Sequence, residues 1–543
     1  MKSSHTRVFR TLLSALTLVC APLVSHADEK QSLEELRNTV INLLQALVDE
    51  GVITKEKAQQ MVKAAQDKAA ADAAALAKSD EGAVRVPYVP QIVKDEIAKQ
   101  VAEEVKPQVV AGVVQEAKAE KWGVPGALAD WLTRTRIYGE VTVREEGLFY
   151  DSNNAHDQFP NYYAINQAGS IAKSAAALTE FLDDNEQRVR FRGRARFGVE
   201  SNLTDSISTG MRIVTGNTTD LVSETQTVDG SAPYQFGLDE LYIRLDERNL
   251  MRFPWLTAVV GRFLNPYENP TNLIFHRDLT FTGAAITGRL GLGDGTPEQS
   301  NLFLTIGGHQ LQEIQFSADD KWLVAAQLGA QLRWGEAQHL RVAGGYYDYF
   351  NVTGRLNPPG SPGLYNYTAP QFLRYGNTVF DIANAADPTS NLFALASKFR
   401  LGDVNAVYGI GVGRYELSMT ADAVKNFGYN TTEVAANVGY AVPANRNMGY
   451  QAEFGFGYPT ISGPGAWRGV VGYRFLQNDA VIDGFTDSDF HYFGGTNAKG
   501  YYVTGEVGLA SGLWLRVRYM SANEVDGPHF GVDTLQFDLN ARF

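Results

Sequence analysis

The sequence predicts an all-β barrel that spans a membrane, preceded by a helical segment. Apolar and polar residues alternate along many segments after residue 135, and the chain is rich in glycine (52), tyrosine (25) and phenylalanine (28). No segment beyond the N-terminus reaches the roughly 18 continuous apolar residues that a membrane-spanning helix needs. Without such a helix, a chain crosses a bilayer only as a closed barrel, because lipid cannot satisfy open strand edges.

The N-terminus has the pattern of a secretory signal. Three basic residues open the chain, an apolar core covers 11–24, and the small residues Ser25 and Ala27 stand where a signal peptidase cuts. We therefore predict a signal peptide over 1–27. Cys20 is not expected to carry a lipid, because the residue before it is too bulky. Its loss with the signal would leave no cysteine and no disulfide.

Residues 28–134 are predicted to form a periplasmic helical segment. Between residues 33 and 47, five aliphatic residues recur at spacings of three and four, which places them on one helix face. Gly51 ends this pattern and Thr54 is a suitable N-cap for a second helix, so we predict a helical hairpin. A coiled coil that trimerises the chain is the alternative, although two heptads are short for one.

The clearest strand pattern covers residues 322–334. One face is apolar from end to end and carries Trp322 and Trp334 at its two limits, while the other face includes three polar side chains. Thirteen residues at ~3.3 Å each span roughly 40 Å, and a tilt of about 40° gives close to 30 Å of height. Tryptophan favours the lipid–water boundary, so we predict that both tryptophans lie there.

Similar segments predict a barrel over 135–543. We count about 17 of them, and short joins alternate with long ones at 147–186, 350–390 and 478–499. The number of strands should be even because both ends of such a barrel lie in the periplasm. Splitting 404–426 into two strands gives about 18 antiparallel strands, which we favour, and merging a weak pair gives 16. The 350–390 loop either enters the pore or covers the outside.

A row of arginines is the strongest functional candidate. Between residues 188 and 196 arginine occupies every second position, so all five share one strand face, opposite Val189 and Phe191. We expect lipid on the apolar side and water inside the barrel on the arginine side. The residues predicted to line the pore are Arg188, Arg190, Arg192, Arg194, Arg196, Arg212, Arg244, Arg262, Arg468, Arg474, Arg516, Arg518, Glu140, Glu240, Glu453 and Glu506. They indicate either anion selectivity or a salt-bridged wall that only stiffens the barrel.

Motifs for catalysis or metal binding are not found in the sequence. The histidines show no metal-binding spacing, and neither a G-x-S-x-G elbow nor a P-loop occurs. The run Asp479, Asp483, Asp487 and Asp489 does not match an EF-hand, so we expect a solvated external loop there. We predict no enzyme, metal or cofactor, and the net charge of −13 argues against nucleic acid as a partner. A barrel hydrolase with its residues at the rim remains the alternative.

The chain resembles the putative-porin family of Gram-negative outer membranes over nearly its whole length. The resemblance is carried by "LVDEGVITKEKAQQMVKAA", "VPYVPQIVKDEIAKQV", "GYRFLQNDAVIDGFTDSDFH" and "LRVRYMSANEVDGPHFGVDTLQFDLNARF". The terminal Phe543, with alternating apolar residues before it, also resembles the signal that the barrel-assembly machinery reads. The resemblance implies a channel in the outer membrane, without naming a substrate.

We therefore expect a passive outer-membrane channel for small polar solutes with a modest preference for anions. The alternative is a plugged, structural barrel that tethers the membrane through its periplasmic helices. The expected partners are outer-membrane lipid, lipopolysaccharide and the barrel-assembly machinery, with a homotrimer as a further alternative.

Overall fold

The computed structural model describes residues 133–543 apart from short gaps, and a few helical positions between Lys57 and Lys68. The gaps are 217–219, 223–225, 228–232, 316, 336, 385–389 and 493. The chain divides into two compact units, Met1–Val113 and Val114–Phe543. The predicted signal peptide and most of the predicted helical segment lie outside the described residues. Among those described, no helix is long and apolar enough to cross a membrane.

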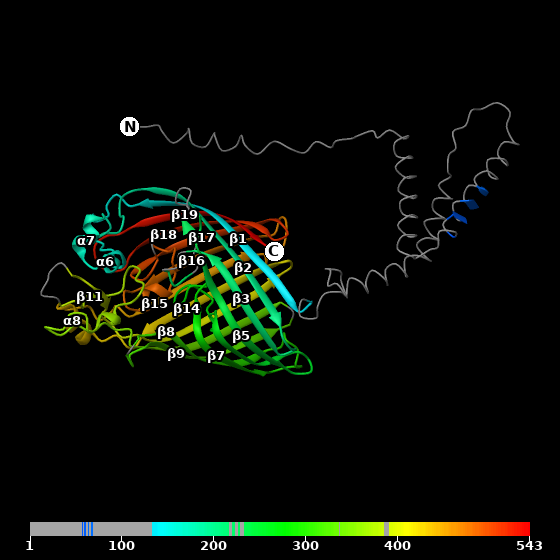
Figure 1. The fold of residues 1–543 in the computed structure, drawn as a ribbon, viewed down its shortest axis with the longest axis horizontal. Helices are drawn as coiled ribbons and strands as arrows, with labels where there is room; N and C mark the ends of the chain where they lie inside the picture. Colours follow the sequence, from blue (N-terminus) through cyan, green and yellow to red (C-terminus); the bar gives the residue numbers. More distant parts are fainter. Residues whose placement is uncertain are drawn as a thin grey trace, which may run out of the picture. The chain divides into compact units, whose positions relative to one another are not determined.

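Sixteen long antiparallel strands close into a barrel (Figure 1). The wall strands are β1 (Thr135–Tyr150), β2 (Arg188–Asn202), β3 (Ile207–Thr215), β5 (Phe236–Arg248), β6 (Pro254–Leu264), β7 (Thr280–Gly291), β8 (Asn301–Gln312), β9 (Lys321–Trp334), β10 (Gln338–Phe350), β13 (Arg400–Val412), β14 (Tyr415–Asn426), β15 (Met448–Gly457), β16 (Trp467–Leu476), β17 (Ala498–Ala510), β18 (Leu513–Glu524) and β19 (Val532–Arg542). Each pairs with its neighbours along the chain, and β1 pairs with both β2 and β19, so the wall closes.

The all-β transmembrane class is confirmed, and the count is sixteen, the smaller of the two predicted numbers rather than the favoured eighteen. The 404–426 stretch does form two strands, β13 and β14. Other extended segments stay out of the wall: β11 (Val379–Asp381) and β12 (Phe393–Leu395) pair only with each other, and the two-residue β4 (Gln226–Thr227) makes a minor pairing with β2. A local extended pattern therefore does not decide whether a strand joins the barrel.

Alternation sorts the side chains of each strand between the two faces of the wall. In β2 the apolar Val189 and Phe191 are 68% and 57% exposed on the outside, while the arginines between them face inward. Trp322 and Trp334 lie exposed near the two ends of β9, and their place at the membrane boundaries stays a prediction. The outer face is therefore the apolar one, which is the arrangement that lipid requires.

Loop lengths differ between the two ends of the barrel. One end, here called the turn end, carries both barrel termini and tight connections such as 203–206, 413–414 and 511–512. Phe543 exchanges two backbone hydrogen bonds of 3.1 Å with Gly139 there. The other end, here called the loop end, carries the long connections, including three short helices: α6 (Tyr162–Ala168), α7 (Ile171–Ala176) and α8 (Thr431–Val438).

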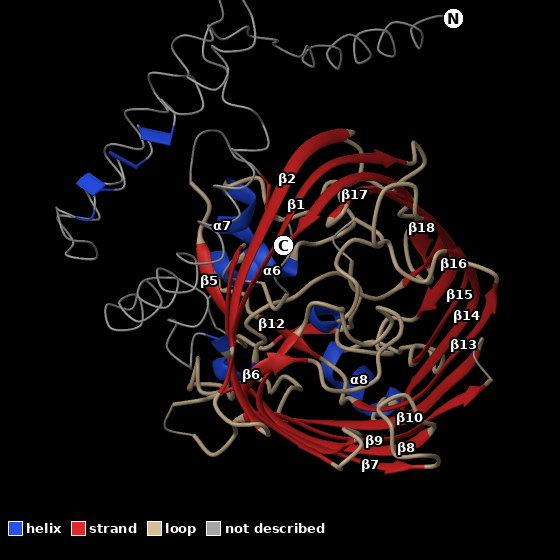
Figure 2. Ribbon diagram, turned by 90° about the vertical axis from the view of Figure 1, so that its right-hand side faces the viewer, coloured by secondary structure: helices blue, strands red, loops and turns tan. Residues whose placement is uncertain are grey.

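Two loops from the loop end, 265–279 and 477–497, fold into the barrel (Figure 2). Their apolar side chains pack on inward-facing wall residues such as Phe281 and Leu401 to form one buried core. The loop residues of this core include Leu273, Ile274, Phe275, Leu279, Ala480, Val481, Ile482 and Phe485. The longer 351–399 loop also contributes Leu373 and Leu395. The main hydrophobic core of this protein thus lies inside the barrel, because the outer apolar face is reserved for lipid.

Candidate functional site: a charged cavity inside the barrel

A cavity of about 750 Å³ lies inside the barrel. Its wall comes chiefly from β1 and β2, from β14 to β19, and from the 265–279 and 477–497 loops. Ten arginines and eight carboxylates line it, so charge of both signs faces the space. Such a lining is far too polar for a protein core and is stable only where water or a polar solute fills the space.

The arginine row of β2 (Arg188, Arg190, Arg192, Arg194 and Arg196) faces inward, and all but Arg188 lie within 4 Å of a carboxylate on β1. Residues directly opposite in an antiparallel pair share a face, and the register sets Arg190 opposite Glu146 and Arg196 opposite Glu140. Arg190 Nη2 lies 2.6 Å from Glu146 Oε1, and Arg192 Nη1 lies 3.1 Å from Glu146 Oε2. One buried glutamate therefore separates two neighbouring guanidinium groups.

Asp278, on the 265–279 loop, pairs with the next two arginines of the row. Its two carboxylate oxygens lie 2.7 Å from Arg194 Nη1 and 3.0 Å from Arg196 Nη1. Arg194 also lies 2.9 Å from Glu140 through Nη2. The arginine row thus anchors the loop inside the barrel, and the loop neutralises part of the row.

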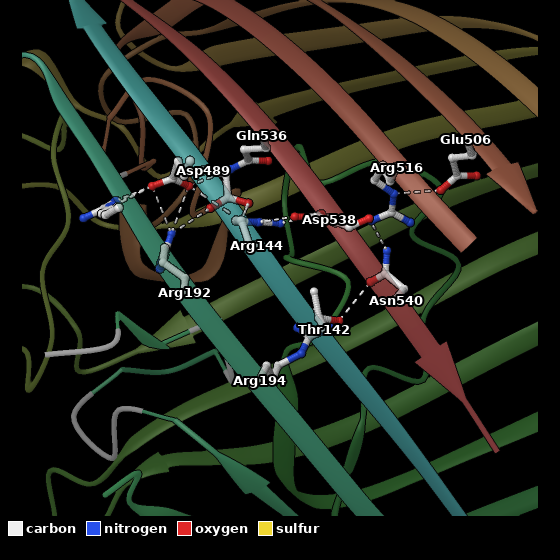
Figure 3. Close-up of polar contacts among 12 residues, drawn as sticks. Thr142, Arg144, Arg192, Arg194, Asp489, Glu506, Arg516, Gln536, Asp538 and Asn540 are labelled. Carbon is white, nitrogen blue, oxygen red and sulfur yellow. Dashed lines mark hydrogen bonds and ion pairs between the residues drawn. The ribbon is translucent and has the colours of Figure 1, made fainter. Parts of the chain in front are cut away.

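The 477–497 loop supplies two more carboxylates to the same wall. Asp489 lies 2.8 Å from Arg144 Nη1, and Arg144 Nε lies 2.7 Å from Asp538 on β19 (Figure 3). Asp487 lies 3.4 Å from Arg474 and 3.6 Å from Arg518. The charges of four strands and one loop therefore form one continuous network.

This result corrects the expectation of a solvated loop at Asp479, Asp483, Asp487 and Asp489. All four lie inside the protein, and the first three are almost completely buried. Asp479 accepts hydrogen bonds from Thr378 N at 2.9 Å and Thr378 Oγ1 at 2.6 Å. The apolar residues between the aspartates carry the loop inward, where wall arginines and loop donors replace water as partners.

The partners of these loop carboxylates decide their pKa values. Burial alone would raise the pKa of Asp278, but Arg196 and Arg194 outweigh it and hold that pKa well below its usual range. Arg144 and Arg192 likewise hold the pKa of Asp489 well below its usual range, although burial alone would raise it. In contrast, burial dominates at two other positions on the 477–497 loop: it raises the pKa of Asp483 to about 7 and that of Asp479 to about 6.

The other predicted residues are mostly inward and paired. Arg212 Nη1 lies 2.6 Å from Glu240, and Arg516 Nε lies 2.7 Å from Glu506. Glu453 accepts a 2.5 Å hydrogen bond from the hydroxyl of Tyr502. The remaining predicted arginines have carboxylate neighbours as follows: Arg188 with Asp183, Arg244 with Asp246, Arg468 with Glu416, Arg474 and Arg518 with Asp487. The predicted residues that border the cavity are Arg194, Arg196, Arg212, Arg468, Arg516, Arg518, Glu140, Glu453 and Glu506.

Arg262 is an exception, because it lies on the outer face of the wall. The register sets it opposite Leu241 on β5 and Thr282 on β7, and both of those side chains are exposed on the outside. Alternation from Val260 and Leu264, which are also exposed, leads to the same face. The prediction that Arg262 lines the pore is therefore wrong. The apolar residues at alternate positions on either side of it in the sequence already indicated the outer face.

Sequence reasoning missed several members of the network. Arg144 and Glu146 alternate in phase with Glu140, so the strand pattern could have found them. Asp278 and Asp489 carried no such signal, because a loop has no fixed period that places its side chains. Among the described residues, no group of three or more histidine, cysteine, aspartate or glutamate side chains is arranged to hold a metal ion.

The closed wall, its apolar exterior and the charged interior cavity define an outer-membrane β-barrel of the pore-forming class. A family model described as putative porin matches residues 37–543, so the chain belongs to the putative-porin family, as predicted. The protein is therefore an outer-membrane porin. No curated protein matches the chain.

Several solved structures are similar in fold. The high-pH structure of OprB from Pseudomonas putida is 10% identical with a TM-score of 0.43, and the match covers 78% of this chain and 97% of that one. The outer-membrane channel DcaP of Acinetobacter baumannii is 11% identical with a TM-score of 0.38, covering 75% and 97%. A loop-deletion mutant of OmpT from Vibrio cholerae is 8% identical with a TM-score of 0.38, covering 75% and 99%.

Proposed function

We propose that this porin is a passive diffusion channel for small polar solutes, with a modest preference for anions, and not an enzyme. The observation that carries the proposal is the cavity of about 750 Å³ inside the barrel, lined by ten arginines and eight carboxylates. Its volume suits small solutes, and its polar lining can replace part of their hydration.

The preference is modest because most of the positive charge is locally neutralised. Arginine stays protonated at any physiological pH, so the row keeps its charge. However, Glu146, Glu140 and Asp278 each lie against members of the row and cancel much of its field in the cavity. The surplus of arginine over carboxylate in the lining is small and positive, which favours anions weakly.

Reversal potentials in planar bilayers test this proposal. Purified porin in a KCl gradient should conduct and should give a reversal potential of the sign expected for chloride preference. The preference should weaken as salt rises, because ions screen the fixed charges. A lipid-only bilayer with the same detergent is the control. Cation preference at all salt concentrations would contradict the anion proposal, whereas a lack of conductance would contradict the channel itself.

One observation favours a second candidate, the plugged structural barrel. Four loop-end segments supply buried apolar residues inside the barrel, including Phe275, Phe485 and Leu373. A densely packed core of this kind narrows the loop half of the bore. The bilayer measurement separates the candidates, since a plugged barrel that only tethers the membrane would insert without conducting.

We further propose that residues 1–27 direct export and are cleaved, and that 28–134 form the periplasmic helical segment. The basic, apolar and small-residue pattern of 1–27 supports the first proposal. Phe543, which closes the wall against Gly139, fits a role as the assembly signal read by the barrel-assembly machinery. The apolar stripe at 33–47 leaves a homotrimer as an assembly to test, by cross-linking the full-length porin in lipopolysaccharide-containing membranes.

A further inference from the structure

Nearly every arginine that lines the cavity lies within 4 Å of a carboxylate, as the ion pairs above describe. Arg277 and Arg136 differ: both border the cavity, and neither forms an ion pair with a residue that the structure describes. Both side chains are exposed. A paired charge contributes little to the field felt by a passing ion, whereas an unpaired charge in a confined space contributes most of it.

Arg277 belongs to the loop that enters the barrel, and its neighbours hold its backbone in place. Its amide donates a 3.1 Å hydrogen bond to Asn272 Oδ1. On one side the amide of His276 donates to Phe485 O at 2.6 Å. On the other side Asp278 forms ion pairs with Arg194 and Arg196. The loop backbone therefore holds Arg277 at a fixed point, and no carboxylate of the described residues lies within 4 Å of its guanidinium.

Arg136 is placed differently. It lies near the start of β1 at the turn end, with its guanidinium 5.3 Å from the ring centre of Tyr138. The register also sets it opposite Glu200, a carboxylate on the same face. Arg136 thus borders the cavity at the turn end of the wall, opposite a carboxylate, whereas Arg277 lies on a loop that folds into the barrel.

We propose that Arg277 is the specificity-determining residue of this channel and that its exposed guanidinium, rather than the arginine row, selects for small anions such as chloride or short carboxylates. The assignment rests on the proposed channel function and names the group that gives it selectivity. In this arrangement the arginine row of β2 anchors the 265–279 loop through its ion pairs with Asp278. Asp278 is the neighbour of Arg277 in the chain, so these ion pairs also fix the position of Arg277. An anion passing the loop meets one positive charge that forms no ion pair with any described residue.

The test is the chloride-to-potassium permeability ratio of single-residue variants in planar bilayers. R277Q should lower the ratio by up to about fivefold, the factor for two unit charges about 4 Å apart in water. R277E should lower it further, and R277K should keep it close to the parent value. The exposed K173Q on α7, outside the cavity lining, is the matched control that removes one positive charge without changing the ratio.

The outcomes separate the assignment from the proposed function. An unchanged ratio in R277Q, or a larger shift in R136Q than in R277Q, would overturn the assignment while the parent porin still conducts. A parent porin that is cation-preferring would contradict the anion proposal, yet a further shift in R277Q would still support Arg277 as the selecting residue. A parent porin that never conducts would overturn both.

Discussion

At the scale of single residues, the arginines of β2 stand side by side because carboxylates from two regions lie between them. Glu146 and Glu140 come from the neighbouring strand, and Asp278 comes from a loop about 80 positions away. Like charges at this spacing repel by amounts comparable to a hydrogen bond, and the repulsion grows where water is scarce. Removing one partner of a partly buried pair leaves an uncompensated charge, which is usually more costly than the pair was favourable.

Substitution of Asp278 tests this arrangement. D278N should raise the chloride-to-potassium permeability ratio, because Arg194 and Arg196 lose a shared carboxylate and one positive charge becomes uncompensated. It should also loosen the 265–279 loop by about 1–3 kcal/mol, the usual cost of losing a charged hydrogen-bond partner. Reversal potentials and protease sensitivity of the loop would measure both effects. D278E, which keeps the charge, is the control, and an unchanged ratio in D278N would count against the network.

At the scale of elements, the 265–279 and 477–497 loops behave as one internal unit. Thr486 Oγ1 lies 2.9 Å from Asn272 O and 2.8 Å from Leu273 O, so its single hydroxyl proton is shared between the two carbonyls. Apolar residues of both loops also share one core. Asp483 further accepts a 3.0 Å hydrogen bond from Arg374 N on the 351–399 loop. The loops are therefore fixed by apolar burial and directed hydrogen bonds together, and not by ion pairs alone.

The anchoring of the 477–497 loop should depend on pH. Burial raises the pKa of Asp483 to about 7, above its unfolded value near 4, so the folded loop holds a proton that the unfolded chain releases. Its contribution to stability is complete below about pH 4 and is lost as pH rises to about 7. Hydrogen exchange of the loop amides, corrected for the intrinsic rate, should show protection falling over this range. D483N should weaken that dependence and leave the part that comes from Asp479 on the same loop, whose pKa is raised to about 6. A fall of equal size in D483N would contradict the assignment to Asp483.

At the scale of the whole molecule, closure of the barrel brings the first and last strands together. β1 pairs with β19 over eleven positions, from Glu140 opposite Arg542 to Tyr150 opposite Val532. Closure removes both free edges, which lipid could not satisfy. It also brings Arg144 beside Asp538 (Figure 3). Arg542 on β19 likewise lies 3.1 Å from Glu140 on β1, so the first and last strands of the wall share two ion pairs at the cavity.

A disulfide across the seam tests this closure. Val143 and Leu539 lie directly opposite, and both are exposed on the outer face. Opposite Cα atoms in an antiparallel pair are about 4.5–5.5 Å apart, which suits a disulfide. V143C/L539C should therefore cross-link on oxidation, as seen by a mobility shift that reduction reverses. V143C/F537C places the second cysteine diagonally, about 7–8 Å away, and should cross-link poorly. Equal yields from both pairs would contradict the register.

The ion-pair network inside the barrel shows which features the alternation of apolar and polar residues can predict and which it cannot. Alternation predicted the inward face of β2 and the outward Val189 and Phe191, and it also contained the evidence that Arg262 faces lipid. The strand number was less certain, because extended segments such as β11 and β12 occur in loops as well as in the wall. Which carboxylates meet the arginines could not be predicted, since partners such as Asp489 lie on a loop whose path depends on packing.

The sequence by itself determined that this chain forms a membrane barrel with a charged interior, because a period of two and an all-apolar face are local properties of each strand. Only the tertiary structure decided that the 477–497 loop enters the barrel, that its aspartates and Asp278 neutralise the arginines, and that Arg277 is left without an ion pair among the described residues. Pairing of this kind depends on distances between segments remote in sequence, and these are set only when the wall closes and the loops pack inside it.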